Sequence, residues 1–211
     1  MMPRHAFDTP RTWTQHAPLH LLAMLSHRRI QFCRSCGTPV RYVVPQDDNR
    51  ERASCPACGT VHYENPLAVV GTLPVWMSQV LLCRRNIEPR FGLWTLPGGF
   101  LELGETTEQG ALRETTEEAG AQIELQGLYT VLNVVHVGQV HLYYRARMLG
   151  PHLDPGPETI EAKLFDEQDI PWDELAFETV RTTLRFFFQD RQSSHFPVRC
   201  ADIASGVTDS P

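Results

Sequence analysis

A block of glycines and charged residues between positions 99 and 121 constrains the fold of this chain more than any other feature. The block reads GFLELGETTEQGALRETTEEAGA. Thr106 or Thr107 can cap a helix, and Gln109 follows Thr106 at the distance of a capping box. Gly120 is a natural end for the same helix. The block therefore predicts a helix with a defined start and a defined end.

Three carboxylates share one face of this predicted helix. Glu114, Glu117 and Glu118 stand at positions i, i+3 and i+4, which brings their Cβ atoms within about 6 Å of one another. Like charges this close repel, so the face is either a solvated acidic surface or a metal site. A hard divalent cation such as Mg²⁺ or Mn²⁺ prefers oxygen ligands and would offset the repulsion. The opposite face carries small residues that allow close packing on a sheet: Ala111, Thr115 and Ala119.

The spacing around the helix favours the metal site. Gly99, Glu105, Arg113 and Gly120 fall on the pattern G-x5-E-x7-R-E-U-x-E-E-x-G-U, in which U is an aliphatic residue. This pattern is the Nudix box, and the chain resembles a Nudix hydrolase. Thr115 stands where an aliphatic residue is expected after the Arg-Glu pair and is a less typical occupant.

Composition and charge limit the other classes of protein. The chain has 211 residues, 42% of them hydrophobic and 21% charged, which allows one ordinary domain and a small module and is typical of a soluble globular protein. A net charge of −6 argues against general affinity for nucleic acids or membranes, because both surfaces are anionic. No run approaches the ~18 apolar residues that a membrane span needs.

The cysteines predict a second, smaller metal site. Four of the six form two C-x2-C pairs separated by eighteen residues: Cys33 with Cys36, and Cys55 with Cys58. Two such knuckles indicate a closed, structural Zn²⁺ site with four thiolates, and an oxidised or degenerate ribbon is the alternative. His62 follows too closely and is surplus as a ligand. Because no convincing signal peptide precedes the pairs, we expect a reducing, cytoplasmic compartment.

The order of motifs predicts four segments, with a boundary at Asn65-Pro66. They are a disordered extension (1–30), a zinc ribbon (31–64), a Nudix domain (65–191) and a flexible tail (192–211). Alternation and turn residues predict strands within the Nudix domain, and apolar residues at helical spacing predict a second helix. The expected strands cover residues 67–76, 80–84, 122–136, 139–148 and 160–165, and the second helix covers residues 173–190. A mixed sheet between two helices is the α/β/α sandwich (class α/β, α+β) that the Nudix resemblance implies.

The resemblance extends beyond the box. Several segments resemble the zinc-ribbon Nudix group that includes plant FAD and ADP-ribose pyrophosphatases: FCRSCG, CPACGTVHYENP, LLCRRNIEPRFGLWTLPGGFLELGET, PGPETIEAKLF and DIPWDELAF. NADH pyrophosphatases share the same order of ribbon and Nudix domain. Members of the family use Mg²⁺ or Mn²⁺ to hydrolyse a pyrophosphate that joins a nucleoside to another moiety.

The resemblance also implies roles for individual residues at the metal. Glu114 and Glu118 would be the principal ligands, and Glu117 would share a second ion. The main-chain carbonyl of Gly98 would complete one shell. A further acid is expected from downstream, and Glu161 matches that place best.

Other implied roles concern the attacking water, the glutamates and the substrate. Glu158 is the alternative to Glu161, and either could be the base that activates water. Charge-assisted bonds from Arg113 would orient the glutamates, with Glu105 as a further partner. The residues expected to bind substrate are two arginines and two aromatic residues on which an adenine could stack: Arg84, Arg85, Trp94 and Tyr144.

The preferred substrate is inferred from what the chain lacks. NADH pyrophosphatases share a Ser-Gln-Pro-Trp-Pro-Phe run shortly beyond the box, where this chain reads LYTVLNVVHVGQVHLYY. The proline that many ADP-ribose pyrophosphatases place sixteen residues past the last box glycine is also missing, since that position is His136. Likeness to the plant enzymes therefore predicts hydrolysis of ADP-ribose, FAD or both, with release of AMP and slower hydrolysis of NADH.

Two alternatives and a set of partners complete the sequence-based expectations. An NADH or NAD pyrophosphatase is the nearest alternative, and a non-catalytic Nudix-like sensor belongs to another class. Known sensors of that type add a DNA-binding helical domain, for which this chain has neither the basic residues nor the room. The intact glutamate set favours catalysis. We expect a small nucleotide substrate, no nucleic-acid or membrane partner, and a homodimer, because many relatives are dimers.

Overall fold

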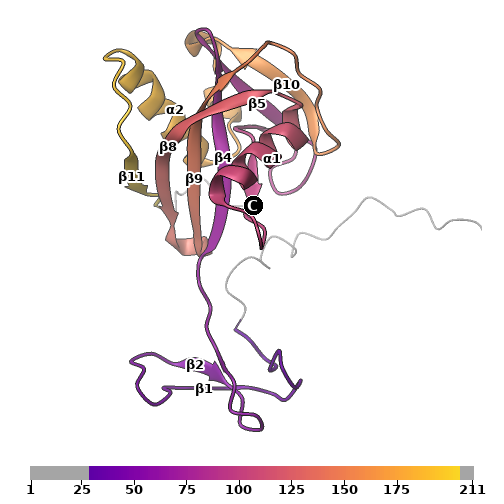
Figure 1. Cartoon of the computed structure of the whole chain (residues 1–211), viewed down its shortest axis with the longest axis vertical. Coiled ribbons are helices and arrows are strands. Elements are labelled where there is room, and N and C mark those ends of the chain that lie inside the picture. The colour runs from indigo at the N-terminus through magenta and orange to yellow at the C-terminus, as the bar shows by residue number, and fades with distance from the viewer. Residues whose placement is uncertain (1–28, 205–211) are drawn as a thin grey trace, which may run out of the picture.

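The computed structural model describes residues 29–204. The expected extension lies outside the described residues except for its last two positions, as do residues 205–211 of the expected tail. Figure 1 shows a small sheet and a larger sheet joined by an extended segment of chain. They correspond to the predicted zinc ribbon and the predicted Nudix domain. Among the helices of residues 29–204, none has the length and apolar character needed to cross a membrane.

The ribbon is a three-stranded antiparallel sheet with two turns of the same conformation. Its strands are β1 (Arg41–Val43), β2 (Arg52–Ser54) and β3 (Val61–His62), paired in that order. Gly37 and Gly59 have φ angles of 74° and 73°, a left-handed conformation that favours glycine. Their amides donate to the carbonyls of Cys33 and Cys55 at 2.9 and 3.0 Å. The two C-x2-C-G segments therefore fold alike.

The larger sheet is mixed, as predicted. Its strand order is β10-β5-β4-β9-β8-β11, with β6 paired to β5 and β7 paired to β4. The pairs β4–β9 and β8–β11 are parallel, and the other pairs are antiparallel. The strands are β4 (Leu67–Trp76), β5 (Gln79–Arg85), β6 (Trp94–Thr95), β7 (Gly98–Phe100), β8 (Ile123–Val134), β9 (Gln139–Met148), β10 (Thr159–Phe165) and β11 (Arg199–Asp202). The five strands expected from the sequence are all present, with shifts of a few residues.

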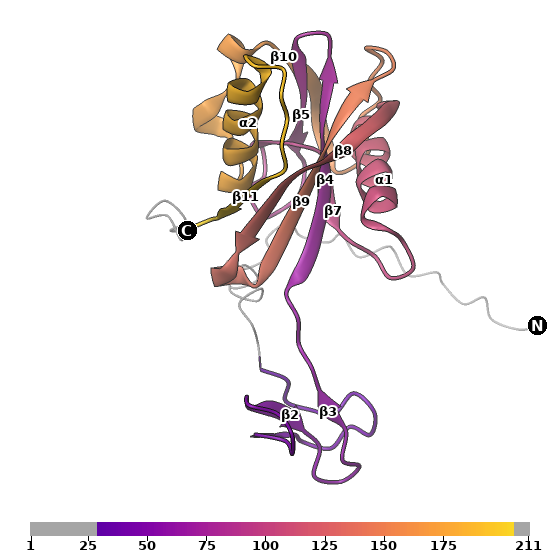
Figure 2. The ribbon, with the colours of Figure 1, turned by 60° about the vertical axis from the view of Figure 1, so that its left-hand side comes forward.

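Two helices cover opposite faces of this sheet (Figure 2). They are α1 (Thr107–Ala119) and α2 (Glu178–Arg191), and short 3-10 turns cover Val135–Val137, Glu167–Asp169 and Trp172–Glu174. The second helix was expected from residue 173, but it begins only at Glu178. Leu175 forms a parallel bridge with Trp94, and the Ala176 amide donates to the Trp94 carbonyl at 2.8 Å. Because the chain pairs with β6 here, it stays extended and the helix starts later.

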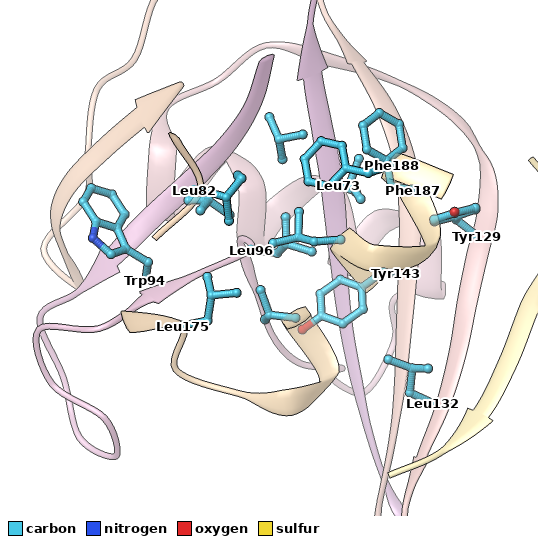
Figure 3. Close-up of a cluster of buried hydrophobic side chains, with 14 of the residues drawn as sticks. Leu73, Leu82, Trp94, Leu96, Tyr129, Leu132, Tyr143, Leu175, Phe187 and Phe188 are labelled. Carbon is cyan, nitrogen blue, oxygen red and sulfur yellow. The ribbon is translucent and has the colours of Figure 1, made fainter. Parts of the chain in front are cut away.

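The two faces of the sheet are packed differently. Large apolar and aromatic side chains fill the layer beneath α2, among them Leu73, Tyr129 and Phe187 (Figure 3). On the other face the small residues of α1 are fully buried against β4, as their size predicted. The Thr115 hydroxyl lies 2.6 Å from that of Thr72 and donates to the Ala111 carbonyl. A threonine is accommodated at this box position because both of its hydrogen-bonding needs are met locally.

The prediction of a flexible tail from residue 192 is wrong for the segment that forms β11. This strand extends the sheet along β8, and the ring of Phe196 lies 3.8 Å beneath the Arg145 guanidinium. Asp190, buried at the end of α2, accepts hydrogen bonds from Tyr129 Oη at 2.9 Å and from Arg199 Nε at 3.1 Å. The segment is held by its pairing with β8, by the charged pair of Arg199 with Asp190 and by the contacts of the Phe196 ring with Tyr129 and Phe187. These contacts leave little apolar periodicity in the segment itself.

We expect Asp190→Asn to destabilise the fold by about 1–3 kcal/mol, because it weakens the three hydrogen bonds that the buried carboxylate accepts from Tyr129 and Arg199. The Arg199 guanidinium holds the pKa of Asp190 below its usual value. The stabilising contribution is therefore complete above the unfolded-state pKa of about 3.9 and is lost as pH falls below it. Denaturant titrations at neutral pH and at about pH 3 measure both effects. The exposed Asp173→Asn is the control, and equal loss of stability in both variants would contradict the role of Asp190.

Candidate metal and pyrophosphate site

Helix α1 is fixed at both ends by the contacts that the sequence predicted. The Thr106 side chain accepts from the Gln109 amide at 3.1 Å, and the Gln109 side chain accepts from the Thr106 amide at 2.8 Å. Gly120 ends the helix with a φ angle of 60°. The two caps thus fix the residues at which α1 begins and ends, and the spacing of the glutamates places them on one face.

A cavity of about 460 Å³ opens beside the acidic face of α1. Its lining combines one arginine with side chains from the loop before α1, from α1 itself and from the loop before β10: Glu102, Arg113, Glu114, Glu117, Glu118, Pro157 and Glu158. Five of these seven residues are glutamates. The three predicted helix glutamates therefore share one cavity with two more carboxylates that the chain brings from elsewhere.

Arg113 links the acidic residues, as expected from its position in the box. Its guanidinium binds Glu105 through two bonds of 2.7 and 3.0 Å. Its Nη1 donates to Glu114 at 2.7 Å and to Glu117 at 3.1 Å, and its Nη2 donates to the Phe100 carbonyl at 3.2 Å. The bond from Arg113 lowers the pKa of Glu105 to about 2, so Glu105 stays ionised and holds the arginine in place.

Glu118 is the most buried of the helix glutamates. Only 7% of its surface is exposed, and its Oε2 accepts the Gly98 amide at 3.0 Å. Burial raises the pKa of Glu118 to about 7 and also raises the pKa of Glu114. Burial penalises the charged form of both side chains, and a bound cation would offset that penalty. This donor set fits a hard divalent ion.

Gly98 and Gly99, at the start of the box, position the backbone against these glutamates. A Cβ on Gly99 would lie 2.5 Å from a carboxylate oxygen of Glu114, so a larger residue there would displace this carboxylate. The Thr72 amide bonds to the carbonyl of Pro97, which makes Gly71 and Gly98 a pair without mutual hydrogen bonds. In such an antiparallel pair both backbone groups of a residue point away from the partner strand. The Gly98 carbonyl therefore faces the same way as its amide, which points at Glu118.

The loop from residue 150 to residue 158 closes the end of α1 and supplies another acid. The Asp154 amide caps the Ala119 carbonyl at 2.8 Å, and a Cβ on Gly156 would lie 1.9 Å from the Glu117 carbonyl oxygen. This tight contact brings Glu158 into the cavity wall. Glu161, the first choice from sequence, is exposed opposite Arg84 and does not line the cavity. A register shift between Thr159 and Glu161, invisible in the sequence, separates the two acids.

The arginines expected to bind substrate are engaged by the loop between β5 and β6. Arg84 Nε donates to the Gly92 carbonyl, and Arg85 Nε donates to the Pro89 carbonyl, both at 2.8 Å. Arg85 is buried, its guanidinium lies 5.1 Å from the centre of the Phe177 ring, and burial lowers its pKa. Both side chains therefore shape this loop, and neither lines the cavity.

The two aromatic residues expected to stack on adenine are part of the core. Trp94 packs edge-on against Phe165 with ring centroids 4.9 Å apart, and the Tyr144 hydroxyl lies 2.7 Å from that of Thr107. Their burial does not support a stacking role. Phe100 is 46% exposed, and its carbonyl accepts a hydrogen bond from Arg113. Its ring is therefore a better candidate for stacking on adenine, and sequence reasoning missed it. Its position beside Gly99 was the available signal.

The four ribbon cysteines converge as the spacing predicted. All four sulfurs lie within 4.8 Å of one another, and adjacent sulfurs are 3.5 to 3.7 Å apart. Four Zn–S bonds of about 2.3 Å in a tetrahedron require S···S distances of ~3.8 Å, so the geometry fits Zn²⁺. Cys33 and Cys55 are buried, whereas Cys36 and Cys58 are exposed. The set is closed by four thiolates and is suited to a structural role.

Known proteins resemble this chain in both parts. Residues 31–64 match the zinc-ribbon family model described as Nudix N-terminal, and residues 66–186 match the NUDIX domain. A NUDIX hydrolase structure from Nitrosomonas europaea has 42% sequence identity and a TM-score of 0.79, and the match covers 82% of this chain and 99% of that one.

Two curated relatives have different names. The NAD-capped RNA hydrolase NudC of Stutzerimonas stutzeri is 32% identical over 145 residues, covering 67% of this chain and 50% of the relative. The ADP-ribose pyrophosphatase of Methanocaldococcus jannaschii is 31% identical over 122 residues, covering 55% of this chain and 70% of the relative. The chain thus spans about half the length of that NudC relative. The box, the fold and these similarities together show that the chain belongs to the Nudix hydrolases and carries the zinc ribbon found at the N-terminus of one group of them.

Proposed function

We propose that this Nudix pyrophosphohydrolase uses Mg²⁺ or Mn²⁺ to cleave ADP-ribose, FAD or both, and releases AMP. The observation that carries the proposal is the cavity that three α1 glutamates and Glu158 line together with Arg113. A site of this kind repels the phosphates of a nucleotide unless cations are present. Divalent ions bound there would neutralise phosphate oxygens and acidify the attacking water.

Each side chain has a distinct part in this proposal. Glu114, Glu118 and the Gly98 carbonyl hold one ion, and Glu117 shares a second. Arg113, itself held by Glu105, keeps the helix glutamates in position. The mutually repelling carboxylates thereby form an ordered set of metal ligands. Glu158 takes the proton of the attacking water, because it lies in the cavity wall on a loop that is packed against the end of α1.

A pair of variants distinguishes the two acids that the sequence left as alternatives. Glu158→Gln is expected to lower kcat by about 10²-fold or more, the usual contribution of a general base. Glu161→Gln is expected to stay within about twofold of the wild type, because surface changes away from a site have small effects. Rates of AMP release at saturating Mg²⁺ provide the measurement. The reverse ranking would show that Glu161 reaches the site during catalysis.

The substrate requires a separate comparison. The absence of the Ser-Gln-Pro-Trp-Pro-Phe run favours ADP-ribose and FAD over NADH, whereas relatives named NAD-capped RNA hydrolase favour NAD-linked substrates. We expect kcat/KM values for ADP-ribose and FAD to exceed that for NADH. A panel that adds NAD-capped RNA and a nucleoside triphosphate would settle the order. A clear preference for NADH, capped RNA or the triphosphate would overturn the substrate proposal while leaving the hydrolase itself intact.

We also propose that the protein acts as a cytoplasmic homodimer on small nucleotides, without a nucleic-acid or membrane partner. The ribbon carries large apolar side chains that are more than half exposed in the single chain: Phe32, Val44 and Tyr63. Large apolar side chains with this exposure would lose contact with water in an interface between two copies of the chain. The net charge of −6 and the four cysteines that are placed to bind Zn²⁺ support the other two parts.

A further inference from the structure

The two knuckles of the ribbon are related by a shift of 22 residues, which makes their differences informative. Cys33 corresponds to Cys55, and Thr38 corresponds to Thr60. The Thr38 hydroxyl lies 3.4 Å from Cys36 Sγ, and the Thr60 hydroxyl lies 3.1 Å from Cys58 Sγ. Each knuckle therefore places a hydroxyl beside its exposed sulfur in the same way.

The two buried sulfurs, those of Cys33 and Cys55, differ in their hydrogen-bonding neighbours. Cys55 Sγ accepts the Cys58 amide at 3.5 Å, and Cys33 Sγ accepts the Ser35 amide at 3.4 Å. Cys33 also has a histidine beside it, because His62 Nε2 lies 3.4 Å from its sulfur. The position equivalent to His62 in the first knuckle is Val40, which offers no polar side chain. The imidazole thus makes a cross-knuckle contact that is found on one sulfur of the pair.

The contact is built into the fold of the ribbon. His62 belongs to β3 and pairs with Ala53 in β2. Only 9% of its surface is exposed. Cys33 is 3% exposed, so water has little access to its sulfur. A Zn²⁺ ion with four thiolates carries a net charge of −2, and buried anionic sulfur is stabilised by N–H donors. The imidazole supplies such a donor where solvent does not.

We propose that His62 is a positioning residue of the zinc site, whose Nε2–H donates a hydrogen bond to the zinc-bound thiolate of Cys33. It is not a fifth ligand, because the four sulfurs already complete a tetrahedron. The bond withdraws electron density from one sulfur and fixes the first knuckle against β3. It requires that Nε2 carries a proton. This assignment concerns the ribbon and is independent of the substrate of the Nudix domain.

The test uses the full-length chain loaded with Co²⁺ for spectroscopy and with Zn²⁺ for release kinetics. His62→Phe keeps a ring of similar size but loses the donor, and His62→Gln restores an N–H donor. His152→Phe, the same substitution at an exposed histidine outside the ribbon, is the matched control. In His62→Phe we expect the sulfur-to-cobalt charge-transfer band to move to lower energy and Zn²⁺ transfer to a chelator to become about tenfold faster, in the range seen for residues that support metal ligands. His62→Gln should lie between His62→Phe and the wild type.

An unchanged band and an unchanged release rate in folded His62→Phe would overturn the proposal, as would wild-type protein that binds neither metal. If His62→Phe does not fold, nitrogen-15 NMR of the wild-type imidazole gives an independent answer. An Nε2–H signal that is protected from exchange with water in the zinc-loaded protein and is lost when Zn²⁺ is removed supports the bond. A proton on Nδ1 alone in the zinc-loaded protein contradicts it.

Discussion

Glu118→Gln is expected to lower kcat by about two to three orders of magnitude at saturating Mg²⁺, while the protein stays folded. The loss follows because a neutral amide is a poor ligand for a hard ion that must stabilise charge in the transition state. The fold should survive because the glutamine carbonyl can still accept the Gly98 amide, and because one buried charge is removed. Rates of AMP release and thermal unfolding measure the two parts separately.

The matched control for this variant lies on the same helix. Glu108 is exposed in the first turn of α1, and Glu108→Gln removes an equal charge without touching the cavity. Its kcat should stay within about twofold of the wild type. Near-normal turnover in Glu118→Gln would remove Glu118 from the set of metal ligands, whatever the behaviour of the control.

The second large effect is expected in the ribbon. Cys33→Ser replaces a buried thiolate by a hydroxyl, which is a poor ligand for Zn²⁺, so the content of about one zinc per chain should fall and soluble protein should decrease. The folded fraction should keep a Mg²⁺-dependent kcat within about twofold of the wild type, because a closed thiolate site takes no part in the reaction. Metal analysis and kinetics on the same sample provide the test.

Cys200→Ser is the control for this substitution. Cys200 is exposed in β11 and has no part in the cysteine cluster, so its replacement should change neither zinc content nor solubility. Selective loss of turnover in zinc-free but folded Cys33→Ser would show that the ribbon contributes to catalysis, and would contradict the separation of the two metal sites.

The parts of the protein that the sequence predicted are those specified by local chemistry. The cap at Thr106, the end at Gly120 and the spacing of the glutamates all act within a few turns of one helix. The ribbon is likewise specified by short knuckles whose cysteines and glycines fix the turn. In both cases the residues that determine the geometry are neighbours in the chain, so their pattern is sufficient.

The differences between the expectations and the structure arise where residues distant in sequence meet. The late start of α2 depends on the pairing of Leu175 with Trp94. The position of β11 depends on the Asp190 carboxylate in α2, which accepts hydrogen bonds from Arg199. The choice between Glu158 and Glu161 depends on a shift of register between two strands. Such contacts are set by tertiary packing, which overrides local preference and is not encoded in a short pattern.

The burial of the expected stacking residues has the same origin. An aromatic side chain next to a motif fits a core as well as it fits a ligand, and its surroundings decide which role it takes. Trp94 has Phe165 from β10 as a partner, which the sequence could not reveal. Phe100 carried a comparable signal in the sequence, its position beside Gly99, but only the fold shows that its ring is exposed.

The most direct test of the account is the dependence of ADP-ribose hydrolysis on a divalent ion in the wild-type chain. Metal-free protein should release no AMP, and addition of Mg²⁺ or Mn²⁺ should start the release of AMP and ribose 5-phosphate in equal amounts. Addition of a chelator should stop it. The ions act at the α1 glutamates in this account, so the activity should not require a change in bound zinc. Tight binding of ADP-ribose without turnover in either metal, or hydrolysis that continues in excess chelator, would contradict it.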